Sequence, residues 1–104
     1  MPDLTQATLR NLQQYVIELE NERGFIDQTI IQKCLLLGEE VGELFKAIRK
    51  SENISTDRNS NIHNVGEELA DILIYLCAIA NRYDIDLEEA FRNKEEINKK
   101  RKWE

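Results

Sequence analysis

The stretch that decides the fold is residues 72–80, Ile-Leu-Ile-Tyr-Leu-Cys-Ala-Ile-Ala, in which no side chain carries a charge. It lies within a proline-free segment that runs from about Ile62 to Tyr83. A helix that is apolar on every side is normally buried among other elements. We therefore expect a central, buried helix over this segment.

Two amphipathic helices are expected before it. The first runs from about Thr5 to Glu22 and is closed by Gly24, because glycine readily adopts the left-handed conformation found at helix ends. Its apolar stripe consists of Leu9, Leu12, Val16 and Leu19. The second begins after Asp27, which is a suitable N-cap, and continues to about Lys50.

Polar residues 51–61 predict a loop before the central helix. Beyond that helix, Asp86-Leu87-Glu88-Glu89 has the spacing of a capping box and opens a fourth helix, whose basic end suits its negative dipole. No strand pattern and no internal repeat interrupts this order. The sequence therefore predicts an all-α, compact four-helix bundle in a single domain, residues 1–104.

Composition narrows the class of protein. A chain of 104 residues is about one domain, and oligomerisation would help to stabilise it, so we expect a homodimer or homotetramer. A net charge of -6 argues against nucleic acid or an anionic membrane as a partner. Without a signal-peptide pattern or an apolar membrane span, we expect a soluble, cytoplasmic protein. Cys34 and Cys77 lack CxxC spacing and are expected to be reduced core residues.

Two pairs of carboxylates are the candidate metal ligands. Glu40 and Glu43 lie three residues apart in the second helix, and Glu68 and Asp71 repeat this spacing in the third. At about 100° per residue, each pair borders an apolar stripe. The stripe of the second helix consists of Cys34, Leu37, Val41, Leu44, Phe45 and Ile48. If the helices pack antiparallel, four acids converge, and only a divalent cation such as Mg²⁺ or Mn²⁺ would let them all stay ionised.

Ordinary surface charge stays open as an explanation of either pair alone. Glu68 and Asp71 could favour the positive end of a helix, and Glu43 could pair with Lys46. Two pairs, each beside an apolar stripe, favour the metal site instead. A di-iron centre would need two Glu-x-x-His units, whereas the one histidine, His63, stands outside any such motif.

A family resemblance rests on these residues. Residues 37–44, Leu-Gly-Glu-Glu-Val-Gly-Glu-Leu, followed by residues 68–71, Glu-Leu-Ala-Asp, resemble the Glu-Glu-x-x-Glu and Glu-x-x-Asp signature of the MazG-type nucleotide pyrophosphohydrolases. The similarity continues through residues 22–25, Glu-Arg-Gly-Phe, and through the spacing of Lys94, Asn98 and Arg101. The related phosphoribosyl-ATP pyrophosphohydrolases share the carboxylates, but the pattern from Lys94 to Arg101 points away from them.

The resemblance implies a MazG-like bundle and a Mg²⁺-dependent enzyme, with Mn²⁺ as an alternative. Its reaction would be hydrolysis of (deoxy)nucleoside triphosphates to monophosphate and pyrophosphate, as in house-cleaning of ordinary or modified nucleotides. The implied metal ligands are Glu40, Glu43, Glu68 and Asp71, and Glu39 would activate the attacking water. The alternative is a helical module on the same fold that senses nucleotides or binds a partner protein without turnover, although the full set of acids favours turnover.

Substrate contacts are implied elsewhere in the chain. Lys94, Asn98 and Arg101 share one face of the predicted fourth helix and could meet phosphate oxygens. Phe25, where many relatives carry Trp, and Tyr75 would lie against the base or sugar. A solvated basic helix end and simple core packing stay open as the respective alternatives.

Overall fold

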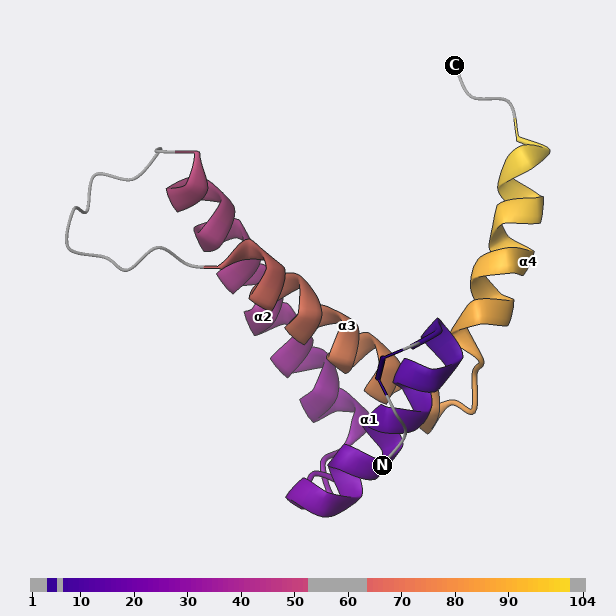
Figure 1. Cartoon of the computed structure of the whole chain (residues 1–104), viewed down its shortest axis with the longest axis horizontal. Coiled ribbons are helices and arrows are strands. Elements are labelled where there is room, and N and C mark those ends of the chain that lie inside the picture. Colours follow the sequence, from indigo (N-terminus) through magenta and orange to yellow (C-terminus); the bar gives the residue numbers. More distant parts are fainter. Residues whose placement is uncertain (1–3, 6, 53–63, 102–104) are drawn as a thin grey trace. The chain divides into compact units, whose positions relative to one another are not determined.

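The computed structural model describes residues 4–5, 7–52 and 64–101, which form four helices and no strand (Figure 1). The helices are α1 (Leu9–Arg23), α2 (Ile30–Ser51), α3 (Val65–Arg82) and α4 (Leu87–Lys99). The predicted all-α fold with four helices is therefore confirmed. Most of the predicted loop, residues 53–61, and His63 lie outside the described residues. None of the described helices combines the length and the apolar character that a membrane span requires.

The chain divides into two compact units. One unit consists of residues 1–27 and 77–104, and it contains α1, the end of α3 and α4. The other unit consists of residues 28–76, and it contains α2 and the part of α3 up to Leu76.

Local signals explain where α1 begins and ends. The Thr8 hydroxyl accepts the backbone N–H of Asn11 at 3.1 Å, so the helix begins at Leu9, later than predicted. Gly24 closes it in the left-handed conformation, with φ of 76°, which glycine adopts without steric conflict. The buried face of α1 consists of Gln13, Val16, Leu19 and Glu20.

The N-terminus of α2 differs from the prediction. Its N-cap is Thr29, not Asp27, and Thr29 forms a capping box with Gln32. The Thr29 hydroxyl accepts the N–H of Gln32 at 3.1 Å, and the Gln32 side chain accepts the N–H of Thr29 at 2.8 Å. Two unpaired backbone donors are thus satisfied reciprocally, which a lone aspartate two residues earlier cannot achieve.

The predicted apolar stripe of α2 is only partly buried. Cys34, Phe45 and Ile48 are exposed, and Phe45 retains 68% of its accessible surface. The fully buried positions are instead Ala47 and Lys33. The prediction that Cys34 is a core residue is therefore wrong, whereas Cys77 is buried as predicted.

A helical wheel gives the reason. Lys33 and Ala47 lie within about 20° of Glu40, whereas Cys34 and Phe45 lie about 120–140° away. A carboxylate oxygen of Glu40 lies within 4.8 Å of oxygens of Glu68 and Asp71 of α3, so the side of α2 that bears Glu40 is the side that faces α3. The acidic face of α2, rather than its most apolar face, is therefore turned inward within this unit.

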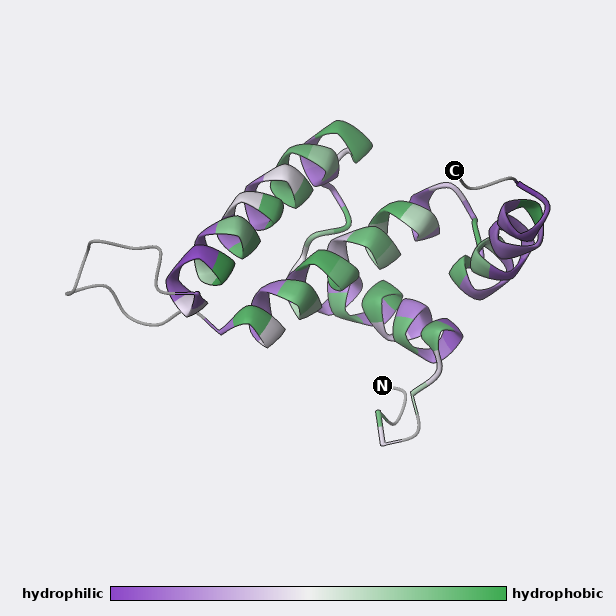
Figure 2. Cartoon of the chain, turned by 90° about the horizontal axis from the view of Figure 1, so that it is seen from above, coloured by the Kyte–Doolittle hydropathy of each residue, from purple (hydrophilic) through white to green (hydrophobic). Residues whose placement is uncertain are grey.

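The apolar segment of α3 is likewise not buried on every side. Cys77, Ala78 and Ala80 are buried, but Leu73 and Leu76 are exposed, which corrects the expectation of a helix enclosed all round. Figure 2 shows hydrophobic residues along much of α3 and hydrophilic residues over most of α4. No described residue of α4 is buried.

Candidate metal centre

Three carboxylates from α2 and α3 meet in one place. One oxygen each of Glu40, Glu68 and Asp71 can be chosen so that all three lie within 4.8 Å of one another. Glu40 comes from the middle of α2, and Glu68 and Asp71 come from adjacent turns of α3. Because i and i+3 positions of a helix share a face, the spacing of Glu68 and Asp71 brings both side chains toward Glu40.

The electrostatics of this cluster are unfavourable for three anions. Burial raises the pKa of the Glu40 carboxyl, and a hydrogen bond with Glu68 and the charges of Asp71, Glu68 and Glu43 raise it further. The raised pKa means that the surroundings of Glu40 disfavour its ionised form, as expected where several carboxylates lie close together without a cation.

The donor set fits a hard divalent cation. Carboxylate oxygens are the ligands that Mg²⁺ and Mn²⁺ prefer, and a cation would offset the repulsion among Glu40, Glu68 and Asp71. Glu40 and Glu68 are half-buried and Asp71 is exposed, so the cluster keeps an open side. An open side leaves room for water and for a ligand beside the cation.

The other two acids of the predicted site lie around this group. Glu43 is half-buried and is not one of the three clustered carboxylates, but its charge contributes to the raised pKa of Glu40. Glu39 is exposed, and its charge contributes to the raised pKa of Tyr75. The structure thus brings Glu40, Glu68 and Asp71 together and leaves Glu43 and Glu39 at their edge.

Tyr75 lies close enough to the carboxylates for their charges to affect its pKa. Burial raises the pKa of its hydroxyl, and the charges of Glu40, Asp71 and Glu39 raise it further. The Lys33 ammonium lies over the Tyr75 ring, 5.8 Å from its centre, and Lys33 is only 2% exposed. Sequence reasoning missed Lys33, although its position seven residues before Glu40, on the same face of α2, would have indicated it.

The remaining predicted contacts belong to the unit of α1 and α4. Phe25 follows the glycine that closes α1, and its ring is partly exposed, while its carbonyl accepts a hydrogen bond from Arg82 at 3.3 Å. Lys94 and Arg101 are exposed, and Asn98 is half-buried.

The end of α4 differs from the prediction. The helix ends at Lys99, so Arg101 follows the helix instead of lying in it. The N–H groups of Lys100 and Arg101 bond to the carbonyls of Ile97 and Asn98, at 3.1 Å in both cases. Such i to i+3 bonds tighten the last turn and satisfy carbonyls that the helix itself leaves open.

Comparison with known proteins places these residues in a family. A family model described as the MazG nucleotide pyrophosphohydrolase domain matches residues 28–103, which include α2, α3, α4 and every clustered carboxylate. A search of curated proteins found no match. The matched segment covers well over half of the chain, so the protein belongs to the MazG nucleotide pyrophosphohydrolase family.

Proposed function

We propose that this chain hydrolyses (deoxy)nucleoside triphosphates to monophosphate and pyrophosphate in a Mg²⁺-dependent reaction that clears ordinary or modified nucleotides. The observation that carries the proposal is the cluster of Glu40, Glu68 and Asp71, whose oxygens lie within 4.8 Å of one another. The chain belongs to a pyrophosphohydrolase family, and the cluster lies inside the matched segment. Mn²⁺ has the same ligand preference and should replace Mg²⁺.

The carboxylates have two different roles in the proposed reaction. Glu40, Glu68 and Asp71, with Glu43 beside them, would hold the cation. A bound cation would neutralise phosphate charge and lower the pKa of a water molecule. Glu39 would accept a proton from water as the water oxygen attacks the α-phosphorus. The bond from the α-phosphorus to the oxygen that bridges to the β-phosphorus then breaks, and pyrophosphate leaves with that oxygen.

Substrate contacts complete the proposal. Lys94, Asn98 and Arg101 would bind phosphate oxygens, and Lys94 and Arg101 are exposed. Tyr75, within the field of the carboxylates, and Phe25, with its partly exposed ring, would contact the base or sugar.

Isotope labelling tests the reaction directly. A panel of nucleoside triphosphates is incubated with the protein and Mg²⁺ in H₂¹⁸O. The products are then separated, and their masses are measured by mass spectrometry. Attack at the α-phosphorus places the label in the monophosphate and leaves pyrophosphate unlabelled. Diphosphate plus inorganic phosphate as products would overturn the proposal. Nucleotide binding without turnover would also overturn it and would favour the sensing module.

Matched variants test the site. Glu68→Gln should abolish turnover, whereas Glu67→Gln removes the same charge from an exposed neighbour and should retain it. Lys94→Ala and Arg101→Ala should each lower kcat/KM at least about tenfold, because a charge-assisted phosphate contact contributes on the order of 1.5–3 kcal/mol. Lys100→Ala removes a charge from the same helix end and should leave kcat/KM near wild type.

We also propose that the active form is a homodimer or homotetramer in which a second copy packs on α2. One line of exposed positions follows a single face of this helix and consists of Ile31, Leu35, Gly38, Gly42 and Phe45. A Cβ added at Gly38 or Gly42 would meet no heavy atom within 4 Å. Glycine inside a helix costs about 0.5–1 kcal/mol relative to alanine, and nothing in the described chain uses the space it leaves.

The order of residues along this line favours a second copy as its occupant. The line is nearly symmetric about the two glycines, so an antiparallel two-fold crossing would place Leu35 against the partner subunit's Phe45 and bring the two backbones close together. Phe45→Glu should therefore produce a monomer in sedimentation or light-scattering measurements. Phe91→Glu is the control, because Phe91 of α4 is also exposed, at 72%, and lies outside the line. A wild-type monomer, or equal dissociation of both variants, would contradict the proposal.

A further inference from the structure

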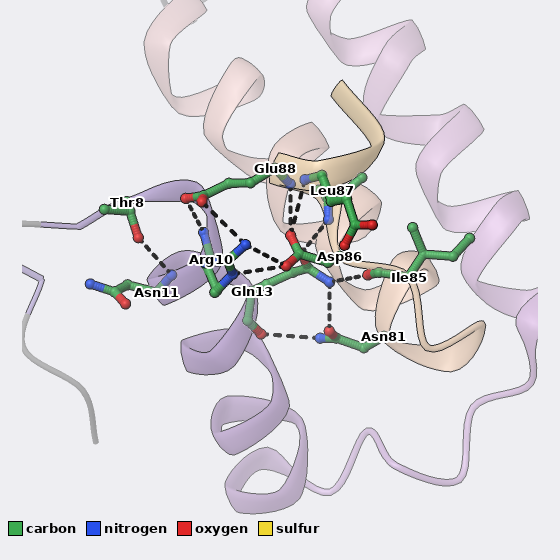
Figure 3. Close-up of polar contacts among 10 residues, drawn as sticks. Thr8, Arg10, Asn11, Gln13, Asn81, Ile85, Asp86, Leu87 and Glu88 are labelled. Carbon is green, nitrogen blue, oxygen red and sulfur yellow. Dashed lines mark hydrogen bonds and ion pairs between the residues drawn. The ribbon is translucent and has the colours of Figure 1, made fainter. Parts of the chain in front are cut away.

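Gln13 of α1 has a buried side chain that the proposed reaction does not use. Only 6% of Gln13 is exposed, and a buried amide destabilises the fold unless its donors and acceptor find partners. Its Nε2 donates to Asn81 Oδ1 at 3.0 Å and to the Ile85 carbonyl at 2.6 Å. Its Oε1 accepts the Leu87 N–H at 2.8 Å (Figure 3). Both amide hydrogens and the amide oxygen are therefore engaged, and the two backbone partners fix the orientation of the amide.

These partners span the connection between α3 and α4. Asn81 lies near the end of α3 and returns a bond from its Nδ2 to the Gln13 carbonyl at 3.1 Å. Ile85 lies in the turn, and Leu87 is the first residue of α4. The turn contains Asp84 in the left-handed conformation, with φ of 56°, which is uncommon for a residue with a side chain. One side chain of α1 thus fixes both ends of an unusual turn.

A second set of contacts reinforces the same place from outside. Arg10 donates to Asp86, the N-cap of α4, at 2.8 Å from Nε, and it pairs with the same carboxylate at 2.7 Å from Nη2. Its backbone N–H donates to Glu88 at 2.8 Å. The Arg10 side chain is 60% exposed, so solvent weakens its ion pair, whereas the bonds of Gln13 are shielded.

The direction of α4 depends on this anchored start. No described residue of α4 is buried, so the rest of the helix has little packing to hold it. At 1.5 Å per residue, Lys94 stands roughly 10 Å and Lys99, the last residue of α4, roughly 18 Å beyond Leu87. A tilt of about 10° at Leu87 would move Lys94 by roughly 2 Å and Lys99 by roughly 3 Å, and Arg101 follows directly after that end. Displacements of about 1 Å are already enough to impair a reacting geometry.

We propose that Gln13 is a positioning residue that sets the direction of α4 and thereby places Lys94 and Arg101 for the phosphates of the substrate. This inference rests on the proposed function, because it assumes that Lys94 and Arg101 bind phosphate. Gln13 precedes residue 28, where the family match begins, so the anchor belongs to a part of the chain outside the matched domain.

Gln13→Met tests the anchor, because it keeps the length of the side chain and removes all three hydrogen bonds. With the triphosphate of highest kcat/KM, this variant should raise KM about three- to tenfold with little change in kcat, as expected when substrate binding alone is weakened. In a double-mutant cycle, Lys94→Ala should lower kcat/KM much less in the Gln13→Met background than in wild type. Gln14→Met is the matched control, since it makes the same substitution at the exposed next residue of α1, and its KM should stay near wild type.

An unchanged KM in folded Gln13→Met would overturn the inference. It would also be overturned if the loss of kcat/KM in the double variant equalled the product of the losses in Gln13→Met and Lys94→Ala. If Gln13→Met does not fold, Gln13→Glu replaces it, because the carboxylate still accepts the Leu87 N–H but donates nothing to Ile85. Calorimetric binding of inorganic tripolyphosphate gives a readout without turnover, and it should weaken in step with KM. A wild-type protein that neither hydrolyses triphosphates nor binds tripolyphosphate refutes the proposed function, whereas an active wild type with an indifferent Gln13 refutes only the anchor.

Discussion

Replacing Glu40 by glutamine should stabilise the protein in the absence of metal and abolish its activity. The oxygens of Glu40, Glu68 and Asp71 lie within 4.8 Å of one another. Two unit charges at that separation repel by about 1 kcal/mol in water and by about 3.5 kcal/mol at an effective dielectric constant of 20. Asp71 is exposed, so solvent screens part of this repulsion. The gain should therefore be near the lower figure, about 1 kcal/mol, or roughly 4 °C in Tm.

The size of this stabilisation should depend on pH. Because the pKa of Glu40 is raised in the folded state, folding is penalised whenever solvent pH favours the ionised carboxyl. The penalty is absent below the ordinary pKa of 4.5 and grows as pH rises through the higher value of the folded state. The advantage of Glu40→Gln should accordingly be largest at neutral pH and should vanish in acid.

Thermal melts in chelator and in Mg²⁺ measure both consequences. Wild type should gain Tm from Mg²⁺ by mass action, and Glu40→Gln should gain much less because a ligand is lost. Glu67→Gln is the control, since Glu67 is exposed, precedes Glu68 and carries the same charge. It should respond to Mg²⁺ as wild type does. If Glu40→Gln melts below wild type in chelator and gains as much from Mg²⁺, the reasoning about the cluster is refuted.

Three further predictions concern the fold. Thr29→Ala removes the N-cap of α2 and should lower the unfolding free energy by about 1 kcal/mol in urea titration. In the native protein, a maleimide should label exposed Cys34 rapidly and Cys77 only on unfolding, because burial shields Cys77 and raises its pKa; equal labelling would contradict the burial. Burial raises the pKa of Asp86, but backbone N–H groups of α4 and the Arg10 guanidinium outweigh it and hold the pKa below its ordinary 3.8. The stability that Asp86 contributes should therefore be lost as pH falls below that value, and Asp86→Asn should flatten this part of a pH titration of Tm.

Helix positions were predictable from the sequence because local signals decide them. Gly24 and Asp86 end and begin helices in the structure as predicted, since left-handed closure and carboxylate capping depend on a few neighbouring residues. The prediction that Asp27 is the N-cap of α2 was wrong, although the sequence contains a better signal. Thr29 followed three residues later by Gln32 is the capping-box spacing, and it identifies the start of α2 better than a lone acid does.

Which face of α2 is buried could not be predicted in the same way. Hydrophobicity favoured the side of Cys34 and Phe45, yet the structure buries Lys33 and Ala47 on the side of Glu40. A periodicity argument counts apolar residues on one helix and contains no information about which side chains a neighbouring helix presents. The spacing of the carboxylates predicted that Glu40 would approach Glu68 and Asp71, but it did not predict that Lys33 and Ala47 would be the buried residues of α2.

This orientation of α2 is itself an argument about function. It places three carboxylates within 4.8 Å of one another and leaves Phe45 68% exposed, so it opposes stability through charge repulsion and through exposed apolar surface. A helix under selection for stability alone would be rotated so that Phe45 faces inward and Glu40 faces water. Proteins depart from local stability rules chiefly at functional sites, where the arrangement is maintained against its cost. The same rotation turns the line of Leu35, Gly38, Gly42 and Phe45 outward, so a second copy packed there would cover the apolar surface that building the carboxylate site leaves exposed.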